Sequence, residues 1–530
     1  MGFSLTEASV EWVESLAELR AWRLRQHRPV HFVPTMGALH QGHGALIRRA
    51  AQPRGGAEPV VVVSVYVNPL QFGPQEDFGR YPRDPEADRS LAEAAGADLL
   101  WAPGVEEMLP GGPAEITRLQ PPASLQSVLC GRSRPGHFEG VATVVARLLA
   151  LVRPQRLLLG EKDWQQLVIL RRLVADLGLP LVLEGVATVR DDDGLACSSR
   201  NRYLSAQERQ QALALPQALA AARQLWSPQA AKPPGDLVAT TRHRLEAAGL
   251  RVEYADLVAA HTLEPLTAPG PALALLAAAV HCGSSRLIDH TLLMSRAPIV
   301  AIDGPAGAGK STVTKAFARC LGLIYLDTGA MYRALTWWVQ RQGADPADPL
   351  AVAPCLHNLD LQLSAAADGG QQVVINGHDV TEAIRSPEVT AQVSLAAAHA
   401  CVREALTAQQ QAMGRRGALV AEGRDIGTAV FPDADLKVFL TATVAERARR
   451  RALDLEQRGF AVPPLPELEA QIAERDHLDS TRDVAPLQMA GDAVELITDG
   501  MTIEAVIQAL VDLFRERVPE EAWPGPVAGG

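Results

Sequence analysis

Short apolar runs alternate with amphipathic stretches along the first 190 residues of the chain. Continuous apolar runs at 30–33 and 60–67 predict buried strands, and the patterned stretch 84–95 predicts a helix. The other elements predicted in this part are strands at 98–101, 156–159 and 181–189 and helices at 11–26, 43–51, 141–152 and 165–177. Apolar strands that alternate with helices are typical of a parallel sheet covered on both faces. We therefore predict an α/β domain over residues 1–190.

The pattern changes after residue 203 and restarts near residue 298. The elements predicted between these points are a helix at 206–226, a loop at 227–235 and strands at 252–258, 272–280 and 287–289. They predict a small α+β domain, 191–290, followed by a connector, 291–297. A new buried strand at 299–302, a Gly-rich turn and a helix then begin a second α/β domain, 298–530.

Composition places the chain among ordinary globular proteins. The 530 residues are 47% apolar and 21% charged. No apolar run approaches the roughly 20 residues that a membrane helix needs. The six cysteines include no C-x-x-C pair, which argues against a zinc site or a disulfide framework. The acidic N-terminus argues against a leader segment, so we expect a cytoplasmic protein with no membrane partner.

Charge is unevenly distributed. Residues 1–297 contain equal numbers of basic and acidic side chains, so the formal net charge of −11 belongs to the remainder. That acidity argues against nucleic acid as a partner. Among 50 basic residues only five are lysine: Lys162, Lys232, Lys310, Lys315 and Lys437. A lysine within a motif is therefore unusually informative in this chain.

A glycine-rich motif follows the strand at 299–302. Residues 304–311 read G-P-A-G-A-G-K-S, which fits the phosphate-loop pattern G-x-x-x-x-G-K-[ST]. Its backbone N–H groups and the following helix N-terminus favour phosphate, Lys310 reaches the β- and γ-phosphates, and Ser311 can hold Mg²⁺. The predicted nucleotide-contacting residues are Gly304, Gly307, Gly309, Lys310, Ser311 and Thr312. The alternative, a Gly-rich turn without a ligand, is disfavoured by the lysine and by the strand–loop–helix context.

Three further charged motifs follow in the same domain. They are L-D-T-G-A-M-Y-R at 326–333, A-E-G-R-D-I-G-T at 421–428, and E-R-D-H-L-D-S-T-R at 474–482. Together with the phosphate loop they closely resemble cytidylate kinase of the bacterial type over about 297–515. The resemblance implies a P-loop nucleoside-monophosphate kinase fold and transfer of the ATP γ-phosphate to CMP or dCMP.

The same resemblance assigns roles to individual side chains. Arg333 holds the CMP phosphate near Asp327, whereas Arg424 and Arg475 line the phosphoryl-transfer centre. The residues implied to read cytosine are Ser394, Arg403 and Asp425, those at the ribose and phosphate are Asp479 and Arg482, and lid arginines are among Arg447, Arg449 and Arg450. Without the family, Ser394 is better interpreted as a structural serine, and Arg450 and Arg451 equally well as a solvated face.

Residues 360–380 predict a β-hairpin. Leu361 and Leu363 alternate before D-G-G at 368–370, and V-V-I at 373–375 follows. The hairpin matches the CMP-binding insertion, about 340–400, that distinguishes the resembled family from shorter kinases. It therefore argues against a thymidylate or adenylate kinase.

A histidine pair marks a second candidate site near the start of the chain. P-T-M-G-A-L-H-Q-G-H at 34–43 follows the first strand, and its two histidines, His40 and His43, lie three residues apart near a helix N-terminus. Such donors beside free N–H groups suit an ATP phosphate. Taken alone, the pair is better interpreted as core or metal-binding residues, although the absence of a third ligand cluster weakens the metal interpretation.

Polar side chains also follow later strands of this domain. They occur in N-P-L-Q-F at 68–72, G-E-K-D-W-Q-Q at 160–166 and C-S-S-R-N at 197–201. Because open parallel sheets bind ligands at the carboxyl ends of their strands, these groups are expected to meet the histidines. Their amides suit the hydroxyls and carboxylate of a hydroxy acid, and Lys162, Ser198 and Arg200 suit phosphates.

These segments resemble pantothenate synthetase (pantoate–β-alanine ligase) over about 30–289. The resemblance implies a Rossmann-like nucleotidyltransferase-type sheet, adenylation of pantoate by ATP, and attack of β-alanine to give pantothenate and AMP. It makes His43 the general acid, with His40, Lys162 and Arg200 also catalytic. The implied ATP site comprises Met36, Gly37, His40, His43, Gly160, Glu161, Lys162, Asp163, Val189, Cys197, Ser198, Ser199 and Arg200. The implied pantoate and β-alanine pocket comprises Asn68, Gln71, Tyr81, Arg134 and Gln166.

The sequence departs from this family at two positions. Cys197 stands where Met or Leu is usual, and the family ending R-L-I-D-N reads R-L-I-D-H at 286–290, which places His290 at the last position. Mg²⁺ is expected to arrive with ATP, with Ser311 in the second site and Asp88 as the nearest carboxylate in the first. A homodimer through the ligase part is a further implication of the resemblance.

Three functional hypotheses follow. The first is a bifunctional enzyme with two working sites. The second is one working enzyme fused to an inactive relic, and the third is a non-catalytic nucleotide sensor. Loss of Lys310 or His43 would be expected for the last two, and both are present. The first hypothesis is favoured, with ATP, CMP or dCMP, pantoate and β-alanine as ligands.

Overall fold

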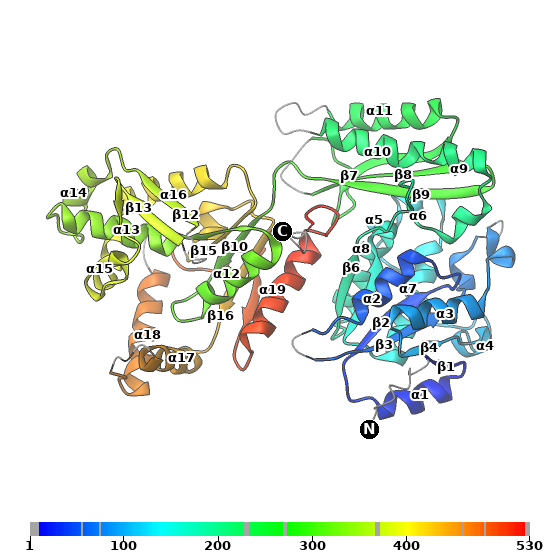
Figure 1. Cartoon of the computed structure of the whole chain (residues 1–530), viewed down its shortest axis with the longest axis horizontal. Coiled ribbons are helices and arrows are strands. Elements are labelled where there is room, and N and C mark those ends of the chain that lie inside the picture. Colours follow the sequence, from blue (N-terminus) through cyan, green and yellow to red (C-terminus); the bar gives the residue numbers. More distant parts are fainter. Residues whose placement is uncertain are drawn as a thin grey trace, which may run out of the picture. The chain divides into compact units, whose positions relative to one another are not determined.

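The chain folds into two compact units (Figure 1). The computed structural model describes residues 10–54, 57–73, 76–226, 233–268, 273–365, 371–457, 459, 461–481 and 484–524. Unit 1 contains the chain up to Ser295 together with Arg515–Pro524, and unit 2 contains Arg296–Phe514. The segment 515–524 therefore corrects the predicted domain 298–530, because it packs with unit 1.

Unit 1 is built around a six-stranded parallel sheet with the order β1-β4-β3-β2-β5-β6. Its strands are β1 (Glu11–Val13), β2 (Val30–Thr35), β3 (Val60–Val65), β4 (Leu99–Trp101), β5 (Arg156–Gly160) and β6 (Val182–Val186). The central strands are almost wholly buried because helices cover both faces, which explains their continuous apolar sequences. This confirms the predicted parallel sheet.

Helices connect these strands. They are α1 (Leu16–Arg25), α2 (Gln41–Ala50), α3 (Pro85–Ala95), α4 (Val105–Met108), α5 (Ala123–Gln126), α6 (Leu129–Ser133), α7 (His137–Val152) and α8 (Trp164–Asp176). Ile47 of α2 and Ala92 of α3 pack against Val33 and Val63 of the sheet. Helix α7 contacts α1, α8 and β2. The predicted helix 11–26 is wrong at its start, because residues 11–13 pair with β4 as a strand.

The smaller part of unit 1 is an antiparallel sheet, β7-β8-β9, packed against helices. Its elements are α9 (Ala206–Ala212), α10 (Ala214–Leu225), α11 (Pro234–Ala247), β7 (Arg251–Ala259), β8 (Ala274–Cys282) and β9 (Ser285–Leu293). The single helix predicted at 206–226 is thus two helices, and most of the predicted loop 227–235 lies outside the described residues. Strand β9 runs into the predicted connector, leaving a shorter link to β10.

Unit 2 contains a five-stranded parallel sheet with the order β11-β15-β10-β16-β17. The strands are β10 (Ile299–Asp303), β11 (Ile324–Asp327), β15 (Leu419–Gly423), β16 (Leu436–Thr441) and β17 (Val494–Ile497). The helices of this unit are α12 (Lys310–Leu321), α13 (Thr328–Arg341), α14 (Pro349–Val352), α15 (Pro387–Ala398), α16 (Ala400–Gly414), α17 (Val444–Gln457), α18 (Leu465–Thr481) and α19 (Ile503–Arg517), which ends beyond the unit boundary.

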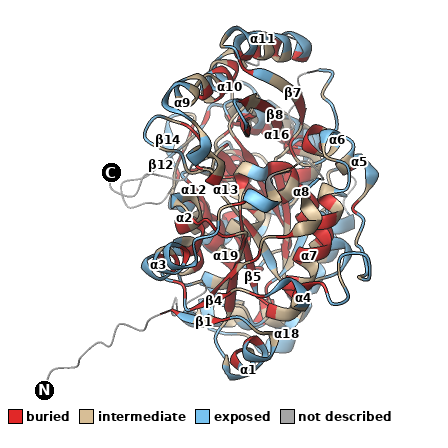
Figure 2. Ribbon diagram, turned by 90° about the vertical axis from the view of Figure 1, so that its right-hand side faces the viewer, coloured by how far each residue is buried: buried red, intermediate tan, exposed pale blue. Residues whose placement is uncertain are grey.

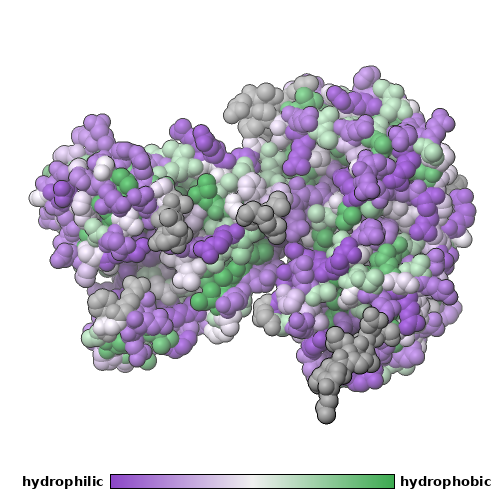
Figure 3. Space-filling view, in the orientation of Figure 1, coloured by the Kyte–Doolittle hydropathy of each residue, from purple (hydrophilic) through white to green (hydrophobic). Residues whose placement is uncertain are grey.

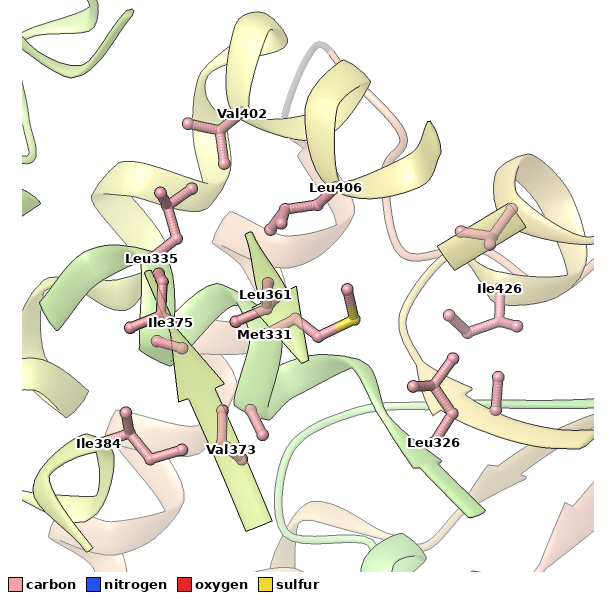
Figure 4. Packing of buried hydrophobic residues seen from close by; sticks show 14 of the residues in the cluster. Leu326, Met331, Leu335, Leu361, Val373, Ile375, Ile384, Val402, Leu406 and Ile426 are labelled. Atoms are coloured by element: carbon pink, nitrogen blue, oxygen red, sulfur yellow. The ribbon is translucent and has the colours of Figure 1, made fainter. Parts of the chain in front are cut away.

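The predicted hairpin is present and gains a third strand. Strands β12 (Leu361–Ala365), β13 (Gln371–Ile375) and β14 (His378–Asp379) form an antiparallel sheet. Figure 4 shows Leu361, Val373 and Ile375 of this sheet facing Met331 and Leu335 of α13. This packing fixes the insertion against the helix that follows β11.

Burial follows the same division between core and surface in both units. Figure 2 shows buried strands such as β4 and β5 inside helices whose outer residues, as on α11, are exposed. Figure 3 shows hydrophilic residues over most of the visible surface of each unit. Among the residues that the structure describes, no helix is both long and apolar enough to span a membrane.

Candidate active sites

The site of unit 2 lies where β10, β11 and β15 end. These parallel strands lead into the phosphate loop, into Asp327 and into 422–425, which together border a cavity of about 730 Å³. The predicted residues that line this cavity are Gly307, Gly309, Lys310, Ser311, Thr312, Asp327, Arg333, Ser394, Arg403, Arg424, Asp425, Arg475 and Asp479. Gly304 supports the loop from outside this lining, and Arg482 lies outside the described residues.

The phosphate loop is held by a close backbone approach at its first glycine. Gly304 has φ of +149°, and a Cβ atom there would lie 2.0 Å from the Leu440 carbonyl oxygen. Helix α12 begins after Gly309, and none of the described side chains caps its N-terminus. Its first N–H groups are therefore available to an anion. Lys310 folds back, and its Nζ donates to the carbonyls of Gly304 and Pro305 at 2.8 Å each.

A buried carboxylate stands beside this loop. Glu422, at the end of β15, accepts from Ser311 Oγ at 2.5 Å and from the Tyr325 hydroxyl at 2.8 Å through Oε1. Its Oε2 is buried and has no hydrogen-bond partner among the described residues. Burial raises the pKa of Glu422, and burial together with Arg424 lowers the pKa of Lys310. Sequence reasoning missed Glu422, although its place in A-E-G-R-D after an apolar run was a usable signal.

A buried ion pair lies at the other side of the cavity. Arg403 Nη1 of α16 donates to Asp425 Oδ2 at 2.8 Å, and both side chains are buried. The Arg403 guanidinium also stacks 5.4 Å from the centre of the Tyr332 ring. These two contacts fix the positions of the ion pair and the ring, so their polar edges are preorganised.

Three arginines surround the space between the loop and this pair. Arg333 Nη2 donates to Asp327 Oδ2 at 3.1 Å, and Arg424 Nε donates to Asp479 Oδ2 at 3.0 Å. Arg475 Nε is buried with no partner within the described ranges, and burial and Arg424 lower the pKa of Arg475. All three guanidinium groups line the same cavity and therefore favour an anionic ligand there.

The arginines of α17 differ from one another. Arg447 and Arg450 donate to the phosphate-loop carbonyls of Ala306 and Ala308, at 3.0 and 3.2 Å. Arg449 is exposed and pairs with Glu446. Arg447 and Arg450 thus contact the phosphate loop, so Arg450 does not belong to a solvated face, whereas Arg451 is exposed. The lid role stays a prediction.

The site of unit 1 lies at the carboxyl ends of β2, β3, β5 and β6. Two cavities, of about 260 and 410 Å³, meet there, and Arg134, Lys162, Asp163, Ser198 and Arg200 line both of them. The other predicted residues that line the first cavity are Met36, His40, His43, Asn68, Gln71, Tyr81, Gly160, Gln166, Val189, Cys197 and Ser199. The sheet thus brings together side chains more than 150 positions apart in the sequence.

The two histidines cap helix α2 instead of merely lying on it. His40 is the N-cap residue, and its Nδ1 accepts from Gly42 N at 3.2 Å. His43 Nδ1 accepts from His40 N at 3.2 Å, and the two ring centres are 4.1 Å apart. Because Nδ1 of each ring accepts a hydrogen bond, a neutral ring must carry its proton on Nε2.

Electrostatics keep both rings neutral in the free site. Burial, assisted by Lys162, lowers the pKa of His40 to about 4. Burial, with His40 and Lys162 adding, lowers the pKa of His43 to about 3. Near neutral pH each ring is therefore an uncharged hydrogen-bond donor through Nε2.

The loop before these histidines needs Gly37 and Asp88. Gly37 has φ of +79°, and a Cβ there would lie 2.9 Å from both Asp88 Oδ2 and Val65 Cγ1. Asp88 is buried and accepts from Ala38 N at 3.1 Å and from Leu39 N at 2.6 Å. The expectation of a metal ligand at Asp88 is corrected, because both carboxylate oxygens hold the loop and the side chain does not line the cavity.

The hydroxy-acid pocket is preassembled around Gln71. Asn68 Nδ2 donates to Gln71 Oε1 at 3.1 Å, and Gln71 Nε2 donates to Met36 Sδ at 2.7 Å. His137 Nδ1 lies 2.8 Å from the Gln71 carbonyl, and Arg134 Nε donates to Glu76 Oε1 at 2.7 Å. His137 and Glu76 received no predicted role, although His137 lies in the R-P-G-H-F motif that contains Arg134.

Of two further predicted ATP-site residues, one faces away from the cavity and one lines it. Glu161 is 1% exposed and does not line the cavity, and burial together with Glu521 raises its pKa to about 8. Cys197 does line it, but burial and Asp191 raise the thiol pKa to about 12, so this departure from the family is a neutral wall residue. Within the described ranges no three His, Cys, Asp or Glu side chains gather as a metal ion would need.

Family comparisons agree with this division. The model of pantoate–β-alanine ligase matches residues 10–292, and the model of cytidylate kinase matches residues 300–516. A bifunctional pantoate ligase/cytidylate kinase of Prochlorococcus marinus is 67% identical over 96% of this chain and 99% of its own. Proteins of the same name from Parasynechococcus marenigrum and a Synechococcus species are 66% and 63% identical, over 96% and 94% of this chain and 99% and 100% of theirs.

The chain belongs to the bifunctional pantoate ligase/cytidylate kinase family. Membership of that family explains why one polypeptide carries both a ligase and a kinase domain. The two family models leave between them only the short link that joins β9 to β10.

Proposed function

We propose that unit 1 joins pantoate to β-alanine at the expense of ATP and that unit 2 transfers the γ-phosphate of ATP to CMP or dCMP. Family membership supports both activities, and both sites keep their cationic and donor side chains in one cavity system each. The observation that carries this proposal is the presence of a preassembled acceptor pocket beside each phosphate site: Gln71 in unit 1 and the Arg403–Asp425 pair in unit 2.

In unit 1, the pantoate carboxylate attacks the α-phosphorus of ATP, and pyrophosphate leaves. The Nε2–H groups of His40 and His43 donate to phosphate oxygens, and Lys162 and Arg200 neutralise the charge that develops. The β-alanine amine then attacks the acyl carbon, the bond from that carbon to the AMP oxygen breaks, and the amine proton is lost to solvent. The two acids are oriented by Asn68 and Gln71 after β3, by Tyr81 in the loop before α3, by Arg134 after α6 and by Gln166 in α8.

A general-acid role for His43 requires a change in its protonation. With a pKa of about 3, the free-site ring cannot supply a proton as imidazolium near neutral pH. The negative charge of bound ATP phosphates raises that pKa, and only in that complex would His43 carry the additional proton. In the free enzyme the proposed role of His43 is that of a neutral donor.

In unit 2, catalysis is positioning and charge neutralisation. The free N–H groups of α12 and Lys310 hold the ATP phosphates, and Arg333 holds the CMP phosphate. Arg424 and Arg475 face the phosphoryl group in transit, and their positive charges offset its negative charge. Asp425 accepts from the exocyclic amine of cytosine, with Arg403 and Ser394 completing base recognition and Asp479 and Arg482 the ribose and phosphate contacts.

Mg²⁺ bound to ATP fits the oxygen donors of unit 2. Ser311 Oγ donates to Glu422 Oε1, and the buried Glu422 Oε2, which has no partner among the described residues, is an oxygen of the kind that Mg²⁺ prefers as a ligand. In unit 1 no comparable carboxylate is proposed, since Asp88 is occupied by the loop. Held in unit 2 by Ser311 and Glu422, the ion would offset the negative charge of the ATP phosphates.

Base recognition can be tested by Asp425→Asn. The change keeps the size of the side chain, weakens the pair with Arg403 and removes an acceptor for the cytosine amine. We expect KM for CMP to rise by one to two orders of magnitude, with KM for ATP changed little. Glu382→Gln, at an exposed pair with Arg385, is the matched control. An unchanged KM for CMP in Asp425→Asn would remove Asp425 from the base site.

A homodimer through unit 1 and a cytoplasmic location complete the proposal. The first is supported by resemblance to dimeric ligases, and the second by the six free cysteines, none of which forms a disulfide in the described part. Sedimentation equilibrium tests the dimer, for which a monomer mass would be the contrary result. Cell fractionation tests the location.

A further inference from the structure

The C-terminal segment that follows α19 packs into unit 1 beside its ATP site. Glu521 Oε1 accepts from the backbone N–H of Thr188 at 2.6 Å, across 333 positions of sequence. Two further contacts anchor the segment just before Glu521. The Arg517 carbonyl lies 2.8 Å from His261 Nε2, and Glu520 Oε1 accepts from Arg49 Nη2 at 3.0 Å.

Thr188 belongs to the wall of the ATP cavity. Residues 186–189 line it, directly after β6 ends at Val186. The Val189 carbonyl accepts from Cys197 N at 2.9 Å, which ties this wall to the C-S-S-R segment on the other side. Thr188 lies between the end of β6 and Val189, and its N–H donates to the Glu521 carboxylate.

The carboxylate of Glu521 sits among charged groups on three elements. Its Oε2 lies 3.3 Å from His290 Nε2 on β9, and its charge contributes to the raised pKa of Glu161 after β5. Burial opposes ionisation of Glu521, but His290 and Thr188 outweigh it and lower its pKa to about 2. Glu521 raises the pKa of His290 against the effect of burial, and Asp289 beside it pairs with Arg190. His290 is also the position at which the chain departs from the R-L-I-D-N ending.

We infer that Glu521 is a positioning residue of the ligase reaction, which fixes the Thr188–Val189 wall of the ATP site through its contact with the Thr188 N–H. This part of the ligase site is therefore supplied by sequence that lies beyond the kinase helices. The inference concerns ATP binding in unit 1 and rests on the ligase activity proposed above.

Kinetics in the full-length chain can separate a positioning role of Glu521 at the ATP site from a role in overall folding stability. In Glu521→Ala we expect KM for ATP in the ligase reaction to rise about tenfold or more, because the Thr188 N–H loses its acceptor. KM for β-alanine and both constants of the CMP reaction should stay within about twofold. Glu521→Gln should restore most of the ATP affinity, because its amide oxygen can still accept from Thr188.

Glu520→Ala is the matched control. It removes the same charge one residue earlier, together with an ion pair to Arg49, but it does not touch the cavity wall. A rise in KM for ATP in Glu520→Ala equal to that in Glu521→Ala would overturn the inference, as would an unchanged KM in Glu521→Ala.

If Glu521→Ala fails to fold, Glu521→Asp provides the test. It keeps the charge but is one methylene short, so a raised KM for ATP supports the inference and a normal one refutes it. If the wild-type chain itself shows no ligase turnover, the proposed function is refuted instead.

Discussion

The two ATP sites begin with the same local architecture, a parallel strand, a loop and a helix, but their helices start differently. In unit 1, His40 and His43 cap α2 with their own side chains. In unit 2, α12 starts after Gly309 with no side-chain cap among the described residues. In the first site the histidine side chains engage two backbone N–H groups, those of His40 and Gly42, whereas in the second no described side chain engages the N–H groups at the start of α12.

This difference determines which atoms hold phosphate. Once the Gly42 and His40 N–H groups are engaged by Nδ1 atoms, the Nε2–H groups of the two rings join Lys162 and Arg200 as side-chain donors of unit 1. Unit 2 can use backbone N–H groups directly, with Lys310 released from the Gly304 and Pro305 carbonyls. Capping thus exchanges backbone donors for side-chain donors that can be repositioned around an α-phosphate.

The largest expected effect is at Lys310. Lys310→Ala removes the one side-chain cation within the loop, and we expect kcat for CMP to fall on the order of a hundred- to a thousandfold. Ligase turnover in the same preparation should be unchanged. Lys315→Ala, on the same helix α12, is the control. Parallel loss of ligase activity in Lys310→Ala would show that the sites do not work independently.

The reciprocal change is at the histidine pair. His43→Ala should lower ligase turnover on the order of a hundredfold and leave the kinase reaction unchanged. The control is His27→Ala, at an exposed position, which should change neither activity.

His40→Asn separates the two roles of the cap. Asn is a good N-cap, so the free energy of unfolding should stay near that of the wild type, whereas His40→Ala should lose about 1 kcal/mol. Both variants lose the Nε2–H donor, so both should bind ATP weakly in unit 1. Retention of full ligase activity by His40→Asn would show that capping, and not donation from the ring, is what the site needs.

A smaller effect is expected at the loop that carries the pair. Gly37→Ala forces a Cβ to within 2.9 Å of Asp88 and Val65 at a left-handed backbone position. We expect a loss of about 1–3 kcal/mol in the free energy of unfolding and a higher KM for ATP. Gly104→Ala, where a Cβ meets nothing within 4 Å, should change neither quantity. Chemical denaturation with ligase kinetics measures both.

The smallest effect is expected from pH. Since the pKa values of His40 and His43 are about 4 and 3 in the free site, kcat/KM for ATP in the ligase reaction should show no histidine ionisation between pH 5.5 and 8. For the kinase, the lowered pKa of Lys310 means that its charge is lost as pH rises, at a pH below the ordinary value of 10.5. An acidic limb near pH 6.5 that disappears in His43→Gln would contradict the neutral-ring account.

The sequence predicted what local pattern determines and missed what distant contacts determine. Continuous apolar runs located β2, β3, β5 and β10, because strands buried on both faces leave no polar positions. Strand β1 was missed because three residues carry little periodicity and are defined by pairing with β4. The site residues were found through motifs, yet the capping role of His40 and the loop role of Asp88 depend on backbone geometry that no motif encodes.

The segment 515–524 shows the same limit most clearly. Nothing near Glu521 in the sequence indicates that it belongs with unit 1, because its partners Thr188 and His290 lie hundreds of positions away. The departure at His290 was visible, but its meaning required the carboxylate that faces it.

The most direct test of the capped-site account is the tautomer of the two rings. Long-range ¹H–¹⁵N correlation of the ring nitrogens at pH 7, assigned by comparison with His40→Asn and His43→Gln, reports it for each ring. We predict that both rings carry their proton on Nε2, have a bare Nδ1, and shift at Nε2–H when ATP is added. A proton on Nδ1 of either ring, or an imidazolium signal in the free enzyme, would contradict the account.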